Sequence, residues 1–383
     1  MANRAESDST PERIVVTGLG LFTPMAATTW RSLAALIHNR SCFSRHPTVL
    51  VAEDRYGTVL RGATVSRVTT AFDRYGLGAA DLTCALLAPA VRDCVSRLGK
   101  APSEGLSLHI VNGLCSDFSF FSPLLQKQLP DLIKRATVAD PGGEVQARHS
   151  FLEQVIAVAA TLSRPDRGTP GAALIAGVDS LCFPPVLESL MKSNRLLGGS
   201  NPEGIIAGEA AGAILLEREQ DACRRGAPIY GRLNACGRGT DPVPRSSCRP
   251  SSARGLTDAF CQAVEERHPE ADGISIVIGD LNGERQRAME WSLVESRVFS
   301  KADAGSGTLW LPAFTSGDCG AAMGAVQSVA ALGALVKGAG GGGDATVFCT
   351  DDGGESRVVC FGPGQFRDRH ALNRWRRQRH GER

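Results

Sequence analysis

The chain has 383 residues, of which 43% are hydrophobic and 21% charged, so it is long enough for one large core or two closely packed halves. Its net charge of +2 gives no overall field that would favour nucleic acid or a membrane as a partner. No apolar run approaches the roughly 20 residues that span a bilayer, and residues 1–12 are polar, without the apolar segment of a secretory signal. We therefore expect a cytoplasmic protein with a disordered N-terminus over residues 1–12.

Twelve cysteines are scattered along the chain. None forms a Cys-x-x-Cys pair, and none has zinc-ligand spacing relative to the seven histidines. Most of them, including Cys84, Cys349 and Cys360, lie inside apolar runs. We expect reduced, buried thiols that pack as small hydrophobic side chains, without a disulfide framework and without a cofactor.

The first part of the chain alternates apolar strands with amphipathic helices. Residues 13–20 predict a strand that ends at glycines, and Thr28 or Thr29 is placed to cap a helix that runs to Ile37. Residues 41–72 are irregular with short strands, and residues 136–148 read as a polar loop. The remaining predicted elements are helices at 73–98 and 149–162 and strands at 106–111, 172–177 and 211–217.

A second round of the same alternation follows residues 238–255, a segment rich in Pro, Arg and Ser that predicts an exposed connection. The predicted elements are helices at 256–267, 284–298 and 320–337 and strands at 274–278, 308–312, 345–349 and 358–361, with a flexible turn at 338–343. Two similar rounds favour an α/β fold with mainly parallel sheets and two halves, residues 13–237 and 256–363.

The basic tail, residues 364–383, carries seven arginines from Arg367 onward. Such a run is suited to nucleic acid or an acidic partner. A solvated, frayed terminus is the interpretation we favour.

Four segments in the same order resemble β-ketoacyl synthases of the thiolase superfamily. They are Ile14-Val-Val-Thr-Gly-Leu-Gly-Leu-Phe-Thr-Pro24, Ala173-Leu-Ile-Ala-Gly-Val-Asp-Ser180, Asn201-Pro-Glu-Gly204 with the following Ala-Gly-Glu-Ala-Ala211, and the small-residue loop at 317–326. The resemblance covers residues 13 to 363. It implies a five-layered αβαβα fold of two similar halves and a homodimer.

The same resemblance implies a Cys-His-His condensing site, and every position of that site differs here. The positions of the cysteine, the two histidines and the lysine correspond to His149, Asp280, Asp318 and Ala313. The family's glycine-phenylalanine-glycine gate is replaced by Asp351-Asp-Gly-Gly354. A carboxylate donates no hydrogen bond to an oxyanion unless it is protonated, and an imidazole is a poorer acyl carrier than a thiolate. We therefore expect ordinary Claisen condensation to be lost.

These substituted positions define the candidate site. His149, Asp280 and Asp318 are the candidate catalytic residues, as an acid–base set or a three-ligand metal site. Asn282, Glu284 and Asp352 are the candidate substrate-binding residues. A vestigial cavity, whose polar residues bond to one another, is the interpretation we favour, and Asp280 or Asn282 also suits a helix cap. Cys115, Cys319 and the aromatic cluster at 118–121 are expected to be structural.

Two functions remain open from the sequence. The first is an acyltransferase-class enzyme with altered chemistry that still binds acyl carrier protein or CoA thioesters. The second is a non-catalytic scaffold or partner subunit, comparable to the chain-length factors of polyketide systems or to thiolase-like accessory proteins of bacterial secretion systems. In either case we expect a homodimer, with a heterodimer as the alternative, and no nucleic acid or membrane partner.

Overall fold

The computed structural model describes residues 12–52, 60–68, 78–96, 105–114, 136–139, 150–165, 168–199, 201–247, 249–267, 273–299, 307–339 and 342–365. His149, Cys115 and the aromatic cluster at 118–121 lie outside the described residues.

Five strands of the N-terminal half form one side of a large mixed sheet. In spatial order they are β1 (Ile14–Phe22), β7 (Ala207–Arg218), β6 (Ala172–Ser180), β4 (Leu106–Asn112) and β5 (Ala136–Ala139). The first two pairings are antiparallel and the last two are parallel. Strand β6 is buried along its whole length, which explains why residues 172–178 are continuously apolar rather than alternating.

The C-terminal half repeats this order and these directions. Its strands are β8 (Gly231–Thr240), β12 (Glu355–Pro363), β11 (Asp344–Thr350), β9 (Ile274–Ile278) and β10 (Thr308–Trp310). Again two antiparallel pairings are followed by two parallel ones. A short antiparallel contact between β1 and β8 joins the two five-stranded parts, so the predicted repeat is present in the topology.

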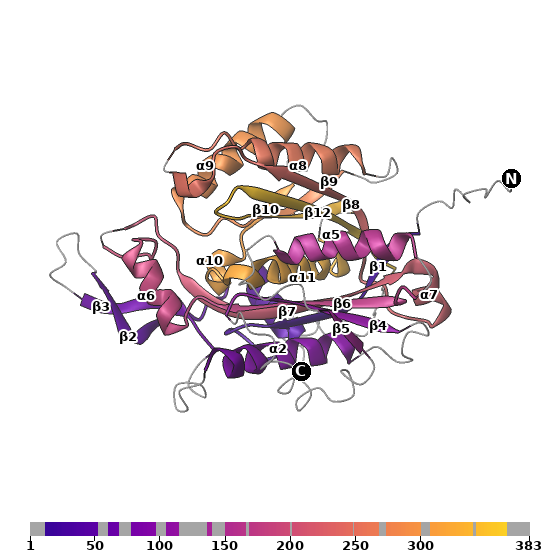
Figure 1. Cartoon of the computed structure of the whole chain (residues 1–383), viewed down its shortest axis with the longest axis horizontal. Coiled ribbons are helices and arrows are strands. Elements are labelled where there is room, and N and C mark those ends of the chain that lie inside the picture. The colour runs from indigo at the N-terminus through magenta and orange to yellow at the C-terminus, as the bar shows by residue number, and fades with distance from the viewer. Residues whose placement is uncertain are drawn as a thin grey trace, which may run out of the picture.

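Helices complete five layers (Figure 1). Helix α2 (Ala79–Val95) covers the outer face of the first sheet, and α8 (Arg254–Glu265) and α9 (Arg285–Val294) lie outside the second. Helices α5 (Ser150–Ser163) and α11 (Met323–Val336) lie between the sheets and contact strands of both. The predicted α/β class and αβαβα layering are confirmed.

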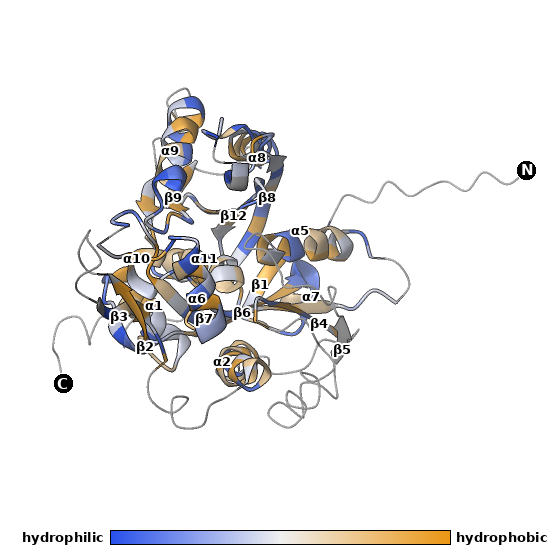
Figure 2. Ribbon diagram, turned by 60° about the vertical axis from the view of Figure 1, so that its left-hand side comes forward, coloured by the Kyte–Doolittle hydropathy of each residue, from blue (hydrophilic) through white to orange (hydrophobic). Residues whose placement is uncertain are grey.

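The remaining elements decorate this framework. They are helices α1 (Thr29–Ile37), α6 (Pro184–Lys192), α7 (Glu219–Arg224) and α10 (Ala313–Ser316), strands β2 (Ser44–Ala52) and β3 (Leu60–Ser66), the 3₁₀ turns Arg245–Ser247 and Gly320–Ala322, and the π-helical turn Glu295–Phe299. The turned view in Figure 2 shows α2 nearly end-on below β6 and β7, with α8 and α9 on the opposite side of the molecule.

The central layer requires small residues. All residues of α11 from Met323 to Leu335 are buried, and most are Ala, Gly, Val or Ser. A helix packed on every side needs such side chains, because both sheets and α5 approach it closely. The small-residue loop and helix that carry the family resemblance thus form the middle of the molecule.

The outer helices approach their sheets at glycines in both halves. A Cβ at Gly20 in β1 would lie 1.9 Å from the carbonyl oxygen of Ala90 in α2, and one at Gly237 in β8 would lie 1.8 Å from that of Ala259 in α8. Since β1 and β8 hold equivalent places, one packing device is used twice.

Some sequence predictions were wrong. Residues 136–139, predicted to begin a loop, form β5, and the predicted connection at 238–255 begins inside β8 and ends inside α8. Helix α6 was not predicted. Thr28 holds the N-cap position of α1 without a side-chain capping bond, while the Thr29 hydroxyl accepts from Leu21 N–H and donates to Asp93. None of the described helices is both long and apolar enough to cross a bilayer.

Candidate functional site

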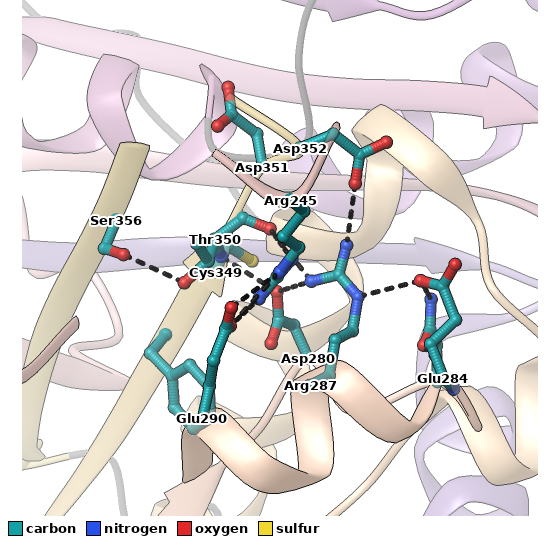
Figure 3. A network of polar contacts seen from close by, with 12 residues as sticks. Arg245, Asp280, Glu284, Arg287, Glu290, Cys349, Thr350, Asp351, Asp352 and Ser356 are labelled. Carbon is teal, nitrogen blue, oxygen red and sulfur yellow. Dashed lines mark hydrogen bonds and ion pairs between the residues drawn. The ribbon is translucent and has the colours of Figure 1, made fainter. Parts of the chain in front are cut away.

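Asp280 lies directly after β9 and is buried, with 1% of its surface exposed. Its Oδ2 accepts a hydrogen bond of 2.6 Å from Arg287 Nη1 and one of 2.8 Å from the backbone N–H of Thr350 at the end of β11. Arg287, from α9, is equally buried and also donates to the Thr350 carbonyl. The carboxylate is therefore neutralised by a guanidinium in a closed environment (Figure 3).

Asp318 lies in the loop between α10 and the 3₁₀ turn Gly320–Ala322 and is also buried. Strand β7 fixes its backbone, because Asp318 N–H donates to Ile206 and its carbonyl accepts from Gly208. Its side chain accepts 2.6 Å from Asn282 Nδ2 and 2.9 Å from Gly320 N–H. A strand of the N-terminal half thus positions a carboxylate of the C-terminal half.

Asn282 and Glu284 connect the two aspartates. The Asn282 amide donates to Glu284 Oε2 at 3.1 Å as well as to Asp318, and its Oδ1 accepts from Glu284 N–H. Glu284 also accepts from Arg287 at 3.3 Å. Asn282 therefore forms a turn ahead of α9. The predicted capping of this helix by Asp280 or Asn282 is wrong, because the N-cap is Glu284 without a side-chain capping bond and Asp280 is bonded to Arg287 and Thr350.

Arg195 joins this cluster from the segment that follows α6. Its guanidinium donates to both oxygens of Glu284, at 2.7 and 3.0 Å, and to Asp352 at 2.7 Å. Asp352 lies in the turn between β11 and β12 and also faces Arg287 at 3.6 Å. Arg195 thus links the N-terminal half to two separate loops of the C-terminal half.

A further buried ion pair supports the cluster from behind. Arg245 donates bidentately to Glu290 of α9 and at 3.0 Å to the carbonyl of Thr350 (Figure 3). Both side chains of this pair are less than a tenth exposed. Two guanidiniums, those of Arg245 and Arg287, therefore share the carbonyl at the end of β11.

Within this network, the pKa values of Glu284 and Arg195 are both shifted in the direction that favours the charged form. Burial by itself would raise the pKa of Glu284, but the hydrogen bond from Arg195 and the charges of Arg287 and Arg195 outweigh it and hold that pKa at about 2. Burial lowers and the carboxylates of Glu284 and Asp352 raise the pKa of Arg195, with a net increase. Glu284 and Arg195 are charged across the physiological pH range.

An open pocket of about 300 Å³ adjoins the cluster. It is lined on one side by Asp179, Asp318 and the 3₁₀ turn and on the other by Arg195, Arg287 and Asp352. Asp280 does not line it. The pocket therefore offers Asp318 and the arginine–aspartate surface to a ligand, and keeps Asp280 behind Arg287.

The structure thus brings together five of the six predicted site residues, namely Asp280, Asn282, Glu284, Asp318 and Asp352; His149 lies outside the described residues. Ala313 begins α10 and is buried. Cys319 is fully buried against the carbonyls of Ser316 and Gly317, as expected of a structural thiol. Among the described residues, no three His, Cys, Asp or Glu side chains are placed to hold a metal ion.

The arginine side chains of the network were not predicted from the sequence. Arg287 stands three residues after Glu284 in a segment that predicted a helix, so helical spacing could have paired the two. Arg195 and Arg245 carried no such signal, because their partners lie 89 and 45 residues away in the chain. Only the folded backbone brings them to the site.

Comparison with known proteins defines the fold. No family model matches the chain, and no curated protein matches it in sequence. Solved structures do match: a chain from a type II polyketide synthase acyl-carrier protein in complex with its ketosynthase bound to the hexaketide has a TM-score of 0.73 at 14% identity, with 92% of this chain and 99% of that chain covered.

Two further structures agree. The ketosynthase from module 6 of the bacillaene synthase of Bacillus subtilis 168 has a TM-score of 0.72 at 16% identity, with 92% of this chain and 72% of that chain covered. The ishigamide ketosynthase/chain length factor has a TM-score of 0.68 at 16% identity, with 92% and 99% covered. The chain has the thiolase-like fold of ketosynthases.

Proposed function

We propose that this protein is a ketosynthase-fold subunit that does not condense acyl groups and instead serves as a partner in acyl-thioester assembly, in the manner of a chain length factor. The similarity to ketosynthase and ketosynthase/chain length factor structures supports the framework of this proposal. The site chemistry supports the rest, because fold alone does not fix function.

The observation that carries the proposal is the condition of Asp280 and Asp318. By the family resemblance they occupy the positions of the two histidines, which serve as hydrogen-bond donors to a thioester oxyanion. Ionised carboxylates are acceptors only. Asp280 is held by Arg287 and the Thr350 amide, and Asp318 by Asn282 and the Gly320 amide.

The guanidinium of Arg287 does not replace the missing donors in this arrangement. Its nitrogens are directed at Asp280, Glu284, Asp352 and a backbone carbonyl. An oxyanion would have to displace one of these acceptors, and a donor already engaged with a carboxylate is poorly preorganised for catalysis. We therefore assign the network a structural role.

An acyl carrier protein is the proposed partner, because the first of the structures above contains one in complex with its ketosynthase. We further propose a dimer, either with a second copy or with a catalytic ketosynthase subunit. In the second case the chain would supply fold and surface, and its partner would supply the cysteine.

Acylation tests the proposal. The full-length protein is incubated with acetyl-CoA, octanoyl-CoA or octanoyl-loaded acyl carrier protein, and its intact mass is measured. We expect no covalent acyl adduct and a non-covalent complex with the carrier protein in native mass spectrometry. An adduct that disappears in His149→Ala would contradict the non-condensing assignment, and the lack of any complex would contradict the carrier-protein partner.

A second candidate function is acid–base chemistry on a bound thioester by His149 and Asp318. One observation favours it: Asp318 lines the pocket, where a ligand can reach it. In this case Asn282, Glu284 and Asp352 would bind substrate. Turnover of an acyl-CoA that is lost in both His149→Ala and Asp318→Asn would support this function over the first.

A further inference from the structure

An apolar groove lies on a surface that the candidate site does not use. It has a volume of about 410 Å³ and runs between the end of α1, strand β10 and helix α10. Its apolar lining includes Leu36, Ile37, Leu309, Trp310 and Phe314, and Asn39 is the one polar residue among the described residues that line it. The groove is separate from the pocket that contains Asp318.

Phe314 makes this groove unusual. It is 57% exposed, more than any other large hydrophobic side chain among the described residues. Its neighbours in α10 are buried, so the helix is fixed and holds the ring at the surface. Helices α1 and α10 also contact each other, and the Thr315 hydroxyl lies 3.5 Å from the Asn39 side chain. A rigid, exposed aromatic ring beside an apolar recess is typical of a protein-binding surface.

The described segments that line the groove carry no exposed acidic residue. Residues 27–52, which include α1 and β2, contain no Asp or Glu, and Arg31, His38, Arg40 and Arg45 are all exposed there. The only acid between residues 307 and 339 is the buried Asp318. His38 and Arg40 flank Asn39, which itself lines the groove.

We propose that this groove binds an acidic protein segment that inserts an apolar side chain beside Phe314 and Trp310. The apolar recess would receive the anchor, and Arg40 with His38 would attract carboxylates at its rim. A second copy of the chain fits less well, because a symmetric contact through this patch would bring Arg40 close to its own counterpart. A discrete recess is also better suited to a single protein side chain than to a lipid surface.

The test is a selection of random displayed peptides on the full-length protein. We expect enriched peptides to be acidic and to contain an aromatic or aliphatic residue. Phe314→Ser should weaken their binding by about tenfold or more, as for a central interface anchor. Arg40→Glu should weaken it several-fold and reduce its salt dependence.

Two matched variants control for surface changes elsewhere. Met289→Ser removes another exposed apolar side chain beside a different cavity, and Arg254→Glu reverses an exposed charge on α8. Both should leave peptide binding unchanged. Thermal unfolding of each variant checks that the fold is intact. Because Phe314 is exposed, we expect its replacement to leave the fold intact.

Several outcomes would overturn the proposal. They are the failure of any peptide to be enriched, enrichment of peptides without acidic residues, and equal binding to Phe314→Ser and the wild type. Binding to liposomes of phosphatidylcholine and phosphatidylglycerol is measured in parallel. Liposome binding that depends on Phe314 would assign the groove to a membrane instead. None of these outcomes depends on whether the protein condenses acyl groups.

Discussion

The two halves of this protein share a framework and differ at the ends of their strands. Both have five strands in the same order and direction, and both admit an outer helix at a glycine, Gly20 in one half and Gly237 in the other. At the end of β6, Asp179 accepts from the backbone N–H groups of Ser180 and Ala321. At the end of β11, which holds the equivalent place in the other half, the carbonyl of Thr350 accepts from the side chains of Arg245 and Arg287 instead.

This difference distinguishes the backbone packing that the fold requires from the side-chain contacts that can vary in the site. At these glycines a strand packs directly against the backbone of the outer helix and leaves no room for a side chain. Both halves therefore have glycine at this contact. The side chains that follow β9 and β11 belong to loops and contact one another. Ion pairs can therefore take the place of other polar contacts there without moving the strands. Each of the following predictions tests one side of this contrast.

The largest effect is expected when Arg287 is removed. Arg287→Leu leaves Asp280 buried without its counter-charge, and we expect a loss of about 3–5 kcal/mol in the free energy of unfolding. Urea denaturation measures it. The control is Arg254→Leu, which breaks an exposed pair with Asp258 and should cost less than about 1 kcal/mol. A loss for Arg287→Leu as small as that of the control would show that the network is not buried in solution.

Gly20→Ala and Gly237→Ala test the shared framework. Each added Cβ would meet a backbone oxygen at under 2 Å, so we expect both variants to lose roughly 2–3 kcal/mol of unfolding free energy, by similar amounts. Gly78→Ala is the control, because its Cβ would lie 4.0 Å from the nearest atom. A large loss in one half alone would break the proposed equivalence of the halves.

Glu284→Gln tests the charge of the network. The folded pKa of Glu284, about 2, lies below the ordinary value of 4.5, so its stabilisation is complete above pH 4.5 and is lost as the pH falls toward 2. We expect the variant to lose roughly 2 kcal/mol at pH 7. Its difference from the wild type should shrink between pH 4.5 and the acid limit of folding. A pH-independent difference would indicate lost packing rather than lost charge.

Arg195→Ala should have the smallest effect, about 1 kcal/mol, because Arg195 and Asp352 are partly exposed and solvent screens their attraction. High salt should reduce the loss further. Amide hydrogen exchange should increase in the 282–284 loop and the 351–354 turn, and not in β1. Unchanged exchange in both loops would mean that Arg195 does not hold them together.

The contrast between the shared framework and the site also decides how much of the structure could be predicted from the sequence. The landmark segments predicted the layers, because small and apolar residues are demanded by packing that the whole fold shares. Asp280, Asn282 and Glu284 were predicted together with Asp318, because strand ends and a landmark loop marked them. Their partners were not predicted, since Arg195 reaches Glu284 only through tertiary structure. Strand β5 was missed because four residues in a polar context carry too weak a pattern.

The most direct test of the central claim is decarboxylation, the step that needs the oxyanion donors whose positions we propose Asp280 and Asp318 to occupy. Release of labelled carbon dioxide from malonyl-CoA and malonyl-loaded acyl carrier protein is measured with the full-length wild type, Asp280→Asn and Asp318→Asn. We predict no release above the protein-free rate in all three. Release by the wild type that is abolished in Asp318→Asn would contradict the non-condensing assignment.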